Sequence, residues 1–80
     1  MKTNELKKGC RVRLANGWEA ILEDNCKGNI RMATVFGYCT EMGSVYAHDI
    51  VGALVNDVWF VIIHTEAQLR CKESIQKIFG

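Results

Sequence analysis

Residues 8–22 constrain the fold most, because they read as two short strands joined by a tight turn. The turn falls at Ala15-Asn16-Gly17, and Asn-Gly between two strand-like runs is the strongest short-range signal for a β-hairpin. Asn and Gly reach positive φ at little steric cost, which a tight primed turn requires at its two central positions. We therefore predict that the chain opens with a hairpin that turns at Asn16 and Gly17.

The first predicted strand alternates between apolar and charged residues, which is the pattern of a half-buried strand. Three of its residues share the face expected inside and two share the face expected outside: Cys10, Val12 and Leu14 inside, Arg11 and Arg13 outside. The second strand starts at Trp18, and the hairpin is expected to bring Glu19 near Arg13.

Three more extended runs follow, at residues 30–38, 45–55 and 58–63, and Gly52 interrupts the second of them at an expected bend or bulge. The segment 40–44 breaks the strand pattern and is expected to be a connection. Asn56-Asp57 is a second, weaker hairpin signal. The run 58–63 shows no clear polar face, so it is predicted to be the most buried strand.

The hydrophobic period changes after His64. Thr65 and Gln68 have the spacing of a capping box, in which each side chain bonds the other residue's backbone N–H. Apolar residues then recur at helical spacing, at Ala67, Cys71, Ile75, Ile78 and Phe79. We predict an amphipathic helix over residues 65–79, whose apolar stripe covers an open part of the β-domain or, alternatively, meets a partner.

The 80 residues are expected to form one domain, 1–80, with a thin core. The hydrophobic share of 49% argues against disorder, and the net charge of +1 lacks the basic excess of most nucleic-acid binders. No apolar run is long enough for a signal peptide or membrane span, so a cytoplasmic location is predicted.

Metal ligation is not expected, although suitable residue types are present. These are Cys10, Cys26, Cys39, Cys71, His48 and His64. Structural zinc sites use closely spaced ligand pairs, and no such pair occurs. We expect reduced, partly buried cysteines, no metal and no cofactor.

Short strands followed by a helix predict a mainly β fold, here a small five-stranded barrel over 8–64 with a C-terminal amphipathic α-helix. The opening Lys8-Gly9-Cys10-Arg11-Val12-Arg13-Leu14, with Asn16-Gly17 and the strand 18–22, resembles the first hairpin of KOW and Tudor-type barrels, and this resemblance implies a Src-homology-like barrel. The stretches 25–29 and 41–50 resemble short uncharacterised proteins of bacteriophages and prophages. Together these resemblances imply a small phage-encoded binding barrel.

Two clusters supply the candidate binding residues. One is basic, with Arg11, Arg13 and Arg31 on one barrel face and Trp18, Phe36 or Tyr38 nearby, which would suit nucleic acid. The alternative is a solvated face whose arginines pair with Glu19 and Glu23, with Trp18 and Trp59 in the core. The other cluster is polar and comprises Glu41, Tyr46, His48 and Asp49.

Catalysis is not expected from the polar cluster. On an extended strand Tyr46 and His48 share one face while Asp49 points the opposite way. A general base needs a partner within hydrogen-bond reach, which this arrangement denies to His48. The alternative is a purely structural strand, whose polar side chains make ordinary hydrogen bonds and face the solvent.

The function predicted from these features is a non-catalytic binding module. We expect a phage accessory protein that binds and blocks a host protein complex, for example a CRISPR or other defence effector. The alternative is a KOW-like barrel that binds nucleic acid through its arginine face. Formation of a homodimer through a barrel edge or Phe79 is an alternative, and no membrane association is expected. The resemblance to phage proteins implies that the protein acts in the cytoplasm of a bacterial host cell.

Overall fold

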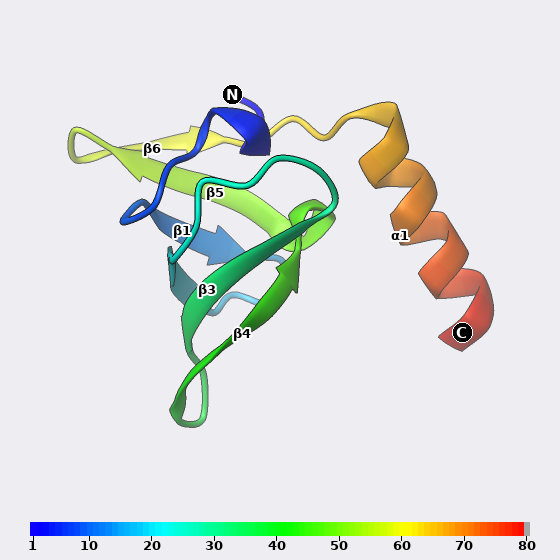
Figure 1. Cartoon of the computed structure of the whole chain (residues 1–80), viewed down its shortest axis with the longest axis horizontal. Helices are drawn as coiled ribbons and strands as arrows, with labels where there is room; N and C mark the ends of the chain where they lie inside the picture. Colours follow the sequence, from blue (N-terminus) through cyan, green and yellow to red (C-terminus); the bar gives the residue numbers. More distant parts are fainter. Residues whose placement is uncertain (80) are drawn as a thin grey trace.

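Six antiparallel strands form one strongly bent sheet in the computed structural model, which describes residues 1–79 and their side chains as far as residue 75 (Figure 1). The strands are β1 (Arg11–Leu14), β2 (Glu19–Leu22), β3 (Ile30–Phe36), β4 (Thr40–Tyr46), β5 (Ile50–Val55) and β6 (Val58–Val61). Two short 3₁₀ turns, η1 (Thr3–Glu5) and η2 (Ala47–Asp49), and one helix, α1 (Glu66–Phe79), complete the described chain.

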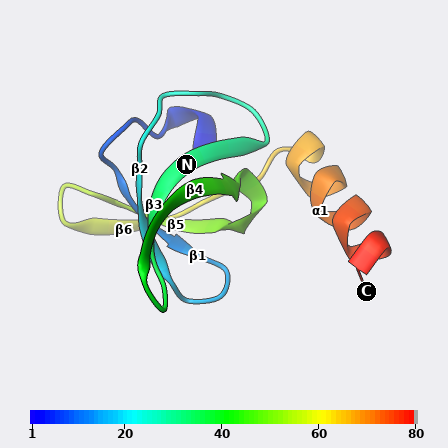
Figure 2. The ribbon, with the colours of Figure 1, turned by 60° about the horizontal axis from the view of Figure 1, so that its bottom comes forward.

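The sheet has two open edges. Its strand order is β4-β3-β2-β1-β5-β6, and within the described residues β4 and β6 do not pair with each other. Figure 2 shows how the sheet curls while these two edge strands stay separate. The mainly β class with a C-terminal helix is therefore confirmed, but the structure has six strands in an unclosed sheet where five in a barrel were predicted.

The additional strand is β4, which runs through the segment 40–44 that was expected to break the pattern. This prediction is wrong because β4 lies at the edge of the sheet, where no residue is fully buried. A strand without a buried face needs no apolar alternation, so Glu41, Gly43 and Ser44 are tolerated within it.

The two predicted hairpins both form, but their turns differ from expectation. In the first, Gly17 alone has positive φ (92°), and its N–H bonds the Leu14 carbonyl at 2.9 Å. The loop is thus a three-residue one, with glycine in the left-handed position. Asn56 and Asp57 have φ of 52° and 64°, so the glycine-free hairpin between β5 and β6 contains the two-residue primed turn.

A bulge at Gly52 confirms the expected irregularity. Arg13 pairs with Gly52 while Leu14 pairs with Ile50, so Val51 is one residue too many on β5. An extra residue in one strand bends it and increases the local twist. The bulge therefore changes the direction of β5 where it approaches η2.

The core lies on the concave side of the sheet and combines aliphatic side chains with three alanines. Val12 and Leu14 point into it and Arg11 and Arg13 point out, as alternation predicted, with Cys10 half-buried. Its buried apolar members are Leu6, Val12, Leu14, Ala20, Leu22, Ala33, Ile50, Ala53 and Ile62.

Strand β6 is the least buried of the strands, which corrects the prediction that residues 58–63 are the most buried. All four of its residues are exposed. The run is apolar on both faces, but β6 has a neighbour on one side only, because it ends the sheet. Only Ile62, just beyond the strand, enters the core.

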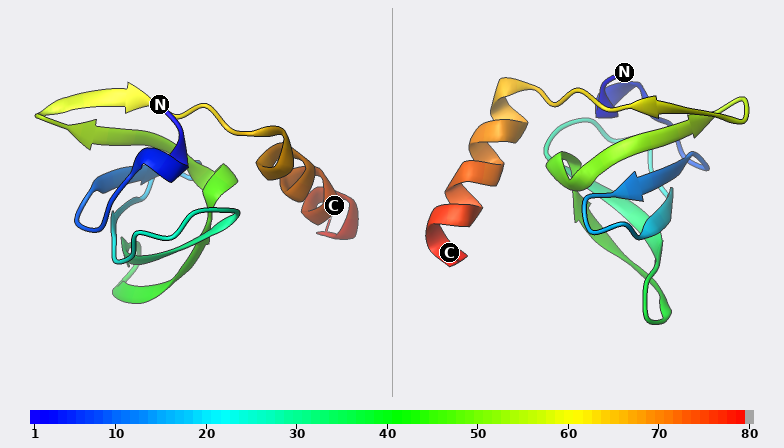
Figure 3. Two further views of the ribbon diagram at one scale, coloured as in Figure 1. Left: turned by 45° about the horizontal axis from the view of Figure 1, so that its top comes forward. Right: turned by 180° about the vertical axis from the view of Figure 1, so that it is seen from behind.

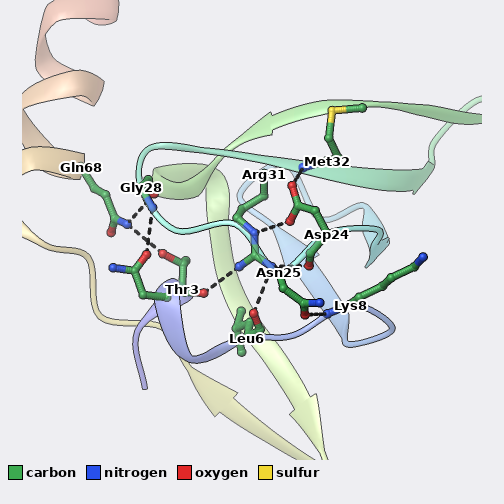
Figure 4. Close-up of polar contacts among 10 residues, drawn as sticks. Thr3, Leu6, Lys8, Asp24, Asn25, Gly28, Arg31, Met32 and Gln68 are labelled. Atoms are coloured by element: carbon green, nitrogen blue, oxygen red, sulfur yellow. Dashed lines mark hydrogen bonds and ion pairs between the residues drawn. The ribbon is translucent and has the colours of Figure 1, made fainter.

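The side chain of Arg31 lies fully buried where the N-terminal segment crosses the loop between β2 and β3 (Figure 4). Its Nε donates to Asp24 Oδ1 at 2.6 Å, Nη1 to the Thr3 carbonyl at 2.8 Å, and Nη2 to the carbonyls of Leu6 and Asp24 at 3.0 and 2.8 Å. Burial acts to raise the pKa of Asp24, but hydrogen bonds from Arg31 and the Met32 N–H outweigh it and lower the pKa.

The predicted capping box begins the helix. The Thr65 N–H donates to Gln68 Oε1 at 3.0 Å and the Gln68 N–H donates to Thr65 Oγ1 at 3.2 Å. Gln68 is also buried, and its Nε2 donates to Thr3 Oγ1 at 2.8 Å, which joins the first turn of α1 to the N-terminal segment.

Beyond this first turn α1 stands to one side of the sheet, beside η2, and does not cover it (Figure 3). The expected covering of the β-domain by the apolar stripe is therefore not seen: of its described members Ala67 is exposed, while Cys71 and Ile75 are half-buried. The stripe's last predicted members, Ile78 and Phe79, have side chains outside the described residues. No described helix is long and apolar enough to cross a membrane.

Replacement of Arg31 by methionine should destabilise the fold by about 3–5 kcal/mol, because it leaves the Asp24 carboxylate and three backbone carbonyls without their buried donor. A domain of this size has about 4–12 kcal/mol in total. Urea unfolding followed by circular dichroism measures the loss.

The matched control is Arg11→Met, since Arg11 is exposed and makes one ion pair and one contact with the Phe36 ring. Each is worth about 0–1 kcal/mol at an exposed site, so this variant should lose clearly less stability than the Arg31 variant. Equal losses in the two variants would show that Arg31 is not the tether inferred from its contacts.

Candidate functional site

The outer face of the sheet collects two arginines, one glutamate and two aromatic rings from four strands. Cross-strand pairs share a face, and the register pairs Arg13 with Glu19, Glu19 with Phe36, Arg11 with Leu54, and Leu54 with Trp59. We name Arg11, Arg13, Glu19, Phe36 and Trp59 the arginine–aromatic face.

Each arginine of this face lies over an aromatic ring. The guanidinium carbon of Arg13 is 4.4 Å from the centre of the Trp59 ring, and that of Arg11 is 5.5 Å from the centre of the Phe36 ring. Trp59 passes across Gly52, where a Cβ would lie 3.6 Å from its ring. Such contacts contribute about 0.5–1 kcal/mol each at exposed sites, so they hold the guanidinium groups in position while leaving them accessible.

One of the two positive charges is compensated within the face. Arg11 Nε donates to Glu19 Oε1 at 2.6 Å. This hydrogen bond lowers the pKa of Glu19, with a further electrostatic contribution from Arg11 and Arg13, so the carboxylate is ionised at neutral pH. Arg13 makes no ion pair within the described residues, which leaves its N–H donors available above the Trp59 ring.

Trp18 lines a separate hollow at the end of the β3–β4 hairpin. Its ring meets Tyr38 edge-on, with centres 5.4 Å apart, and lies so close to Gly37 that a Cβ there would come within 2.5 Å of it. The hollow measures about 260 Å³ and includes Glu41. The reading of Trp18 and Trp59 as core residues is wrong, because they are 37% and 39% exposed.

The polar cluster lies in and beside η2, because residues 47–49 are not extended as predicted. His48 is buried, and its ring stacks on Tyr46 with centres 5.0 Å apart. His48 Nε2 is 3.7 Å from Asp49 Oδ1, beyond hydrogen-bond length, and Nδ1 has no partner. Burial lowers the pKa of His48, although Asp49 acts to raise it.

The structure thus divides the eight predicted site residues among four places. Arg11 and Arg13 stay together on the outer face, whereas Arg31 is buried and cannot join them, so its place in an exposed basic patch is wrong. The other three places are the Arg31 cluster, the Trp18 hollow with Tyr38 and Glu41, and the η2 region with Tyr46, His48 and Asp49. In the described part of the chain all four cysteines are free and no cluster suited to a metal ion occurs.

Trp59 is the site residue that sequence reasoning missed. The signal that could have identified it is the Asn56-Asp57 turn, which makes β6 a terminal hairpin strand. The last strand of a hairpin pairs with the strand before it. Its other side is exposed at the edge of the sheet unless a further strand adds there.

Comparison of the chain with protein-family models, curated proteins and solved structures finds no significant match. The function is therefore inferred from the sequence and the geometry of the surface.

The buried His48 should make stability fall in mild acid. Its folded-state pKa is lowered from an unfolded value of about 6.5, so the unfolded chain takes up the proton first as the pH falls. The stabilising contribution of neutral His48 is complete above about pH 6.5 and declines below it.

Unfolding free energies measured between about pH 5 and 7.5 test this, with His48→Phe as the comparison. Phenylalanine keeps a ring against Tyr46, and the unpartnered Nδ1 makes its removal inexpensive. The variant should lose most of the pH dependence in this range. An unchanged slope would mean that His48 does not cause it.

Proposed function

We propose that this protein is a non-catalytic protein-binding module that uses the arginine–aromatic face to contact its partner. The observation that carries the proposal is Arg13 stacked at 4.4 Å on a half-exposed Trp59. Tryptophan and arginine are the residues most enriched at the energetic centres of protein interfaces. Stacking fixes the guanidinium beforehand, so less side-chain entropy is lost when it meets a carboxylate or carbonyl of the partner.

The amount of exposed apolar surface supports this function. Large apolar side chains are exposed on both edge strands, among them Met42, Tyr46, Trp59, Phe60 and Val61. Large exposed apolar patches on a folded domain mark interaction sites. Here the exposed apolar residues accompany arginines, as in the centre of an interface.

The charges favour a protein over a nucleic acid as the partner. Burial of Arg31 removes one cation from the proposed platform, and Glu19 compensates another. Nucleic-acid affinity derives largely from neutralised phosphates, and two arginines beside a carboxylate supply little of it. His48 and Asp49, the one histidine–aspartate pair among the described residues, are too far apart for proton transfer at 3.7 Å. This distance supports a role without catalysis.

The class of partner follows from the likeness of residues 25–29 and 41–50 to short phage proteins. We propose that the partner is a protein complex of a bacterial host, such as a CRISPR or other defence effector, whose working surface the module occupies. A module of 80 residues without a catalytic centre acts by occupying a surface, so inhibition should be stoichiometric.

The test is quantitative capture from bacterial lysate with wild-type protein, the variant Arg11→Ser/Arg13→Ser, and the control Lys7→Ser/Lys27→Ser. Both variants lose two positive charges from exposed residues, but only the first alters the face. A partner that uses the face should be depleted at least tenfold by the first variant and retained by the control.

The outcomes separate the alternatives. Equal depletion by both variants would indicate non-specific electrostatic capture and contradict the proposed face. If the captured material is nucleic acid, and a mobility shift with purified RNA or DNA weakens steeply with salt, the protein-binding function is wrong and the nucleic-acid function replaces it.

A further inference from the structure

Strand β6 leaves four backbone groups free along its outer edge. In an antiparallel pair, alternate residues direct both backbone groups toward the neighbour. The Ile62 N–H donates to the Val51 carbonyl on β5. Val58 and Phe60 lie four and two residues before Ile62, so their backbone groups also point toward β5. Trp59 and Val61 therefore direct their N–H and C=O groups outward.

The N-terminal residue occupies the next position along this edge. The Ile63 N–H donates to the Met1 carbonyl at 2.8 Å, which confirms that odd-numbered residues point their backbone groups away from β5 and which ends the free stretch. At the other end, Asp57 belongs to the turn. The free edge is thus two outward-facing residues long, flanked by an occupied position and a turn.

This edge also lacks the usual protection against pairing. Natural edge strands carry lysine, proline, a bulge or a covering segment. The sequence of β6 is Val-Trp-Phe-Val, without a charge or proline, and all four residues are exposed. The other edge strand, β4, contains Glu41.

We propose that β6 pairs antiparallel with β6 of a second copy of this chain, with Phe60 on the two-fold axis. An antiparallel ladder must match outward-facing residues with outward-facing residues, so only three registers are open to the self-pair. Centring on Phe60 sets Trp59 opposite Val61 of the second copy and uses all four free groups in four hydrogen bonds. Centring on Trp59 brings in the turn residue Asp57, and centring on Val61 requires the occupied Ile63.

The side chains agree with this register. On one face it places Trp59 of each copy beside Val61 of the other copy, and on the opposite face it places Phe60 beside Phe60. The three exposed apolar side chains thus cover one another. The strand is uncharged and therefore matches itself electrostatically. The two-fold axis is perpendicular to the sheet, which places the arginine–aromatic faces of both copies on the same side.

The dimer is expected to be weak and reversible. Trp59, Phe60 and Val61 are 39, 43 and 77% exposed. Since an aromatic side chain has about 150–250 Å² to bury, the edge offers on the order of 300 Å² per copy, below the ~800 Å² of a standard interface. Dissociation constants in the micromolar range or above follow from such an area.

Cysteine trapping tests the register. In the background Cys26→Ser/Cys39→Ser, which removes the two exposed thiols, single cysteines replace Trp59, Phe60 or Val61 in separate proteins. A residue on the axis meets its own copy at a distance that a disulfide spans, so Phe60→Cys should form a disulfide dimer. Trp59→Cys and Val61→Cys should stay at the background level. Strong trapping at position 59 or 61, or none at 60, overturns the proposed pairing.

Sedimentation from about 10 μM to about 1 mM tests the association without engineered thiols. Phe60→Lys places two ammonium groups opposite each other on the axis and should weaken the dimer at least tenfold. Met42→Lys is the matched control on β4 and should leave it unchanged. A wild-type protein that stays monomeric throughout this range contradicts the proposal. The capture experiment is independent of this result.

Discussion

The buried Arg31 guanidinium is the constraint on which the rest of the structure depends. A guanidinium cannot lose its charge and presents five N–H donors in a fixed plane, so its burial requires acceptors from several directions. Asp24 supplies a carboxylate oxygen and a carbonyl, while Thr3 and Leu6 supply two more carbonyls. The N-terminal segment and the β2–β3 loop must both be in place before this set is complete.

This requirement extends to the helix. Thr3 accepts two of these hydrogen bonds, at its carbonyl from Arg31 Nη1 and at its hydroxyl oxygen from Gln68 Nε2, so one residue joins the Arg31 cluster to the first turn of α1. Leu6, the other N-terminal acceptor, belongs to the apolar core. One buried cation thus couples a polar network to the core of a domain too small to rely on apolar burial alone.

The sequence predicted those features that depend on near neighbours. The hairpin at Asn16-Gly17, the inward face of Val12 and Leu14, and the capping box of Thr65 and Gln68 each follow from residues a few positions apart. Arg31 was misplaced because its acceptors come from residues 3, 6 and 24, and an arginine in an alternating strand reads as solvated unless those acceptors are known.

The candidate site could be predicted only in part for a similar reason. Arg11 and Arg13 share the outer face because strand alternation is local, and the aromatics suggested beside them included Phe36. Trp59 comes from an edge strand whose exposure depends on the position of β6 at the end of the sheet. A buried strand and an unpaired edge strand can have the same apolar sequence pattern, so only the strand order distinguishes the two.

The Gly52 bulge connects the architecture to the proposed binding surface. The extra residue ends the regular β1–β5 ladder, and the Trp59 ring lies beside Gly52, 3.6 Å from where a Cβ would stand. From that position the ring supports Arg13, while the backbone of Trp59 keeps its outward groups free at the sheet edge. Because the ring lies on the outer face and the backbone groups lie in the plane of the sheet, one residue can serve a partner on the face and a second copy at the edge. The two contacts are therefore compatible, and a paired edge would present two arginine–aromatic faces side by side to a single large partner.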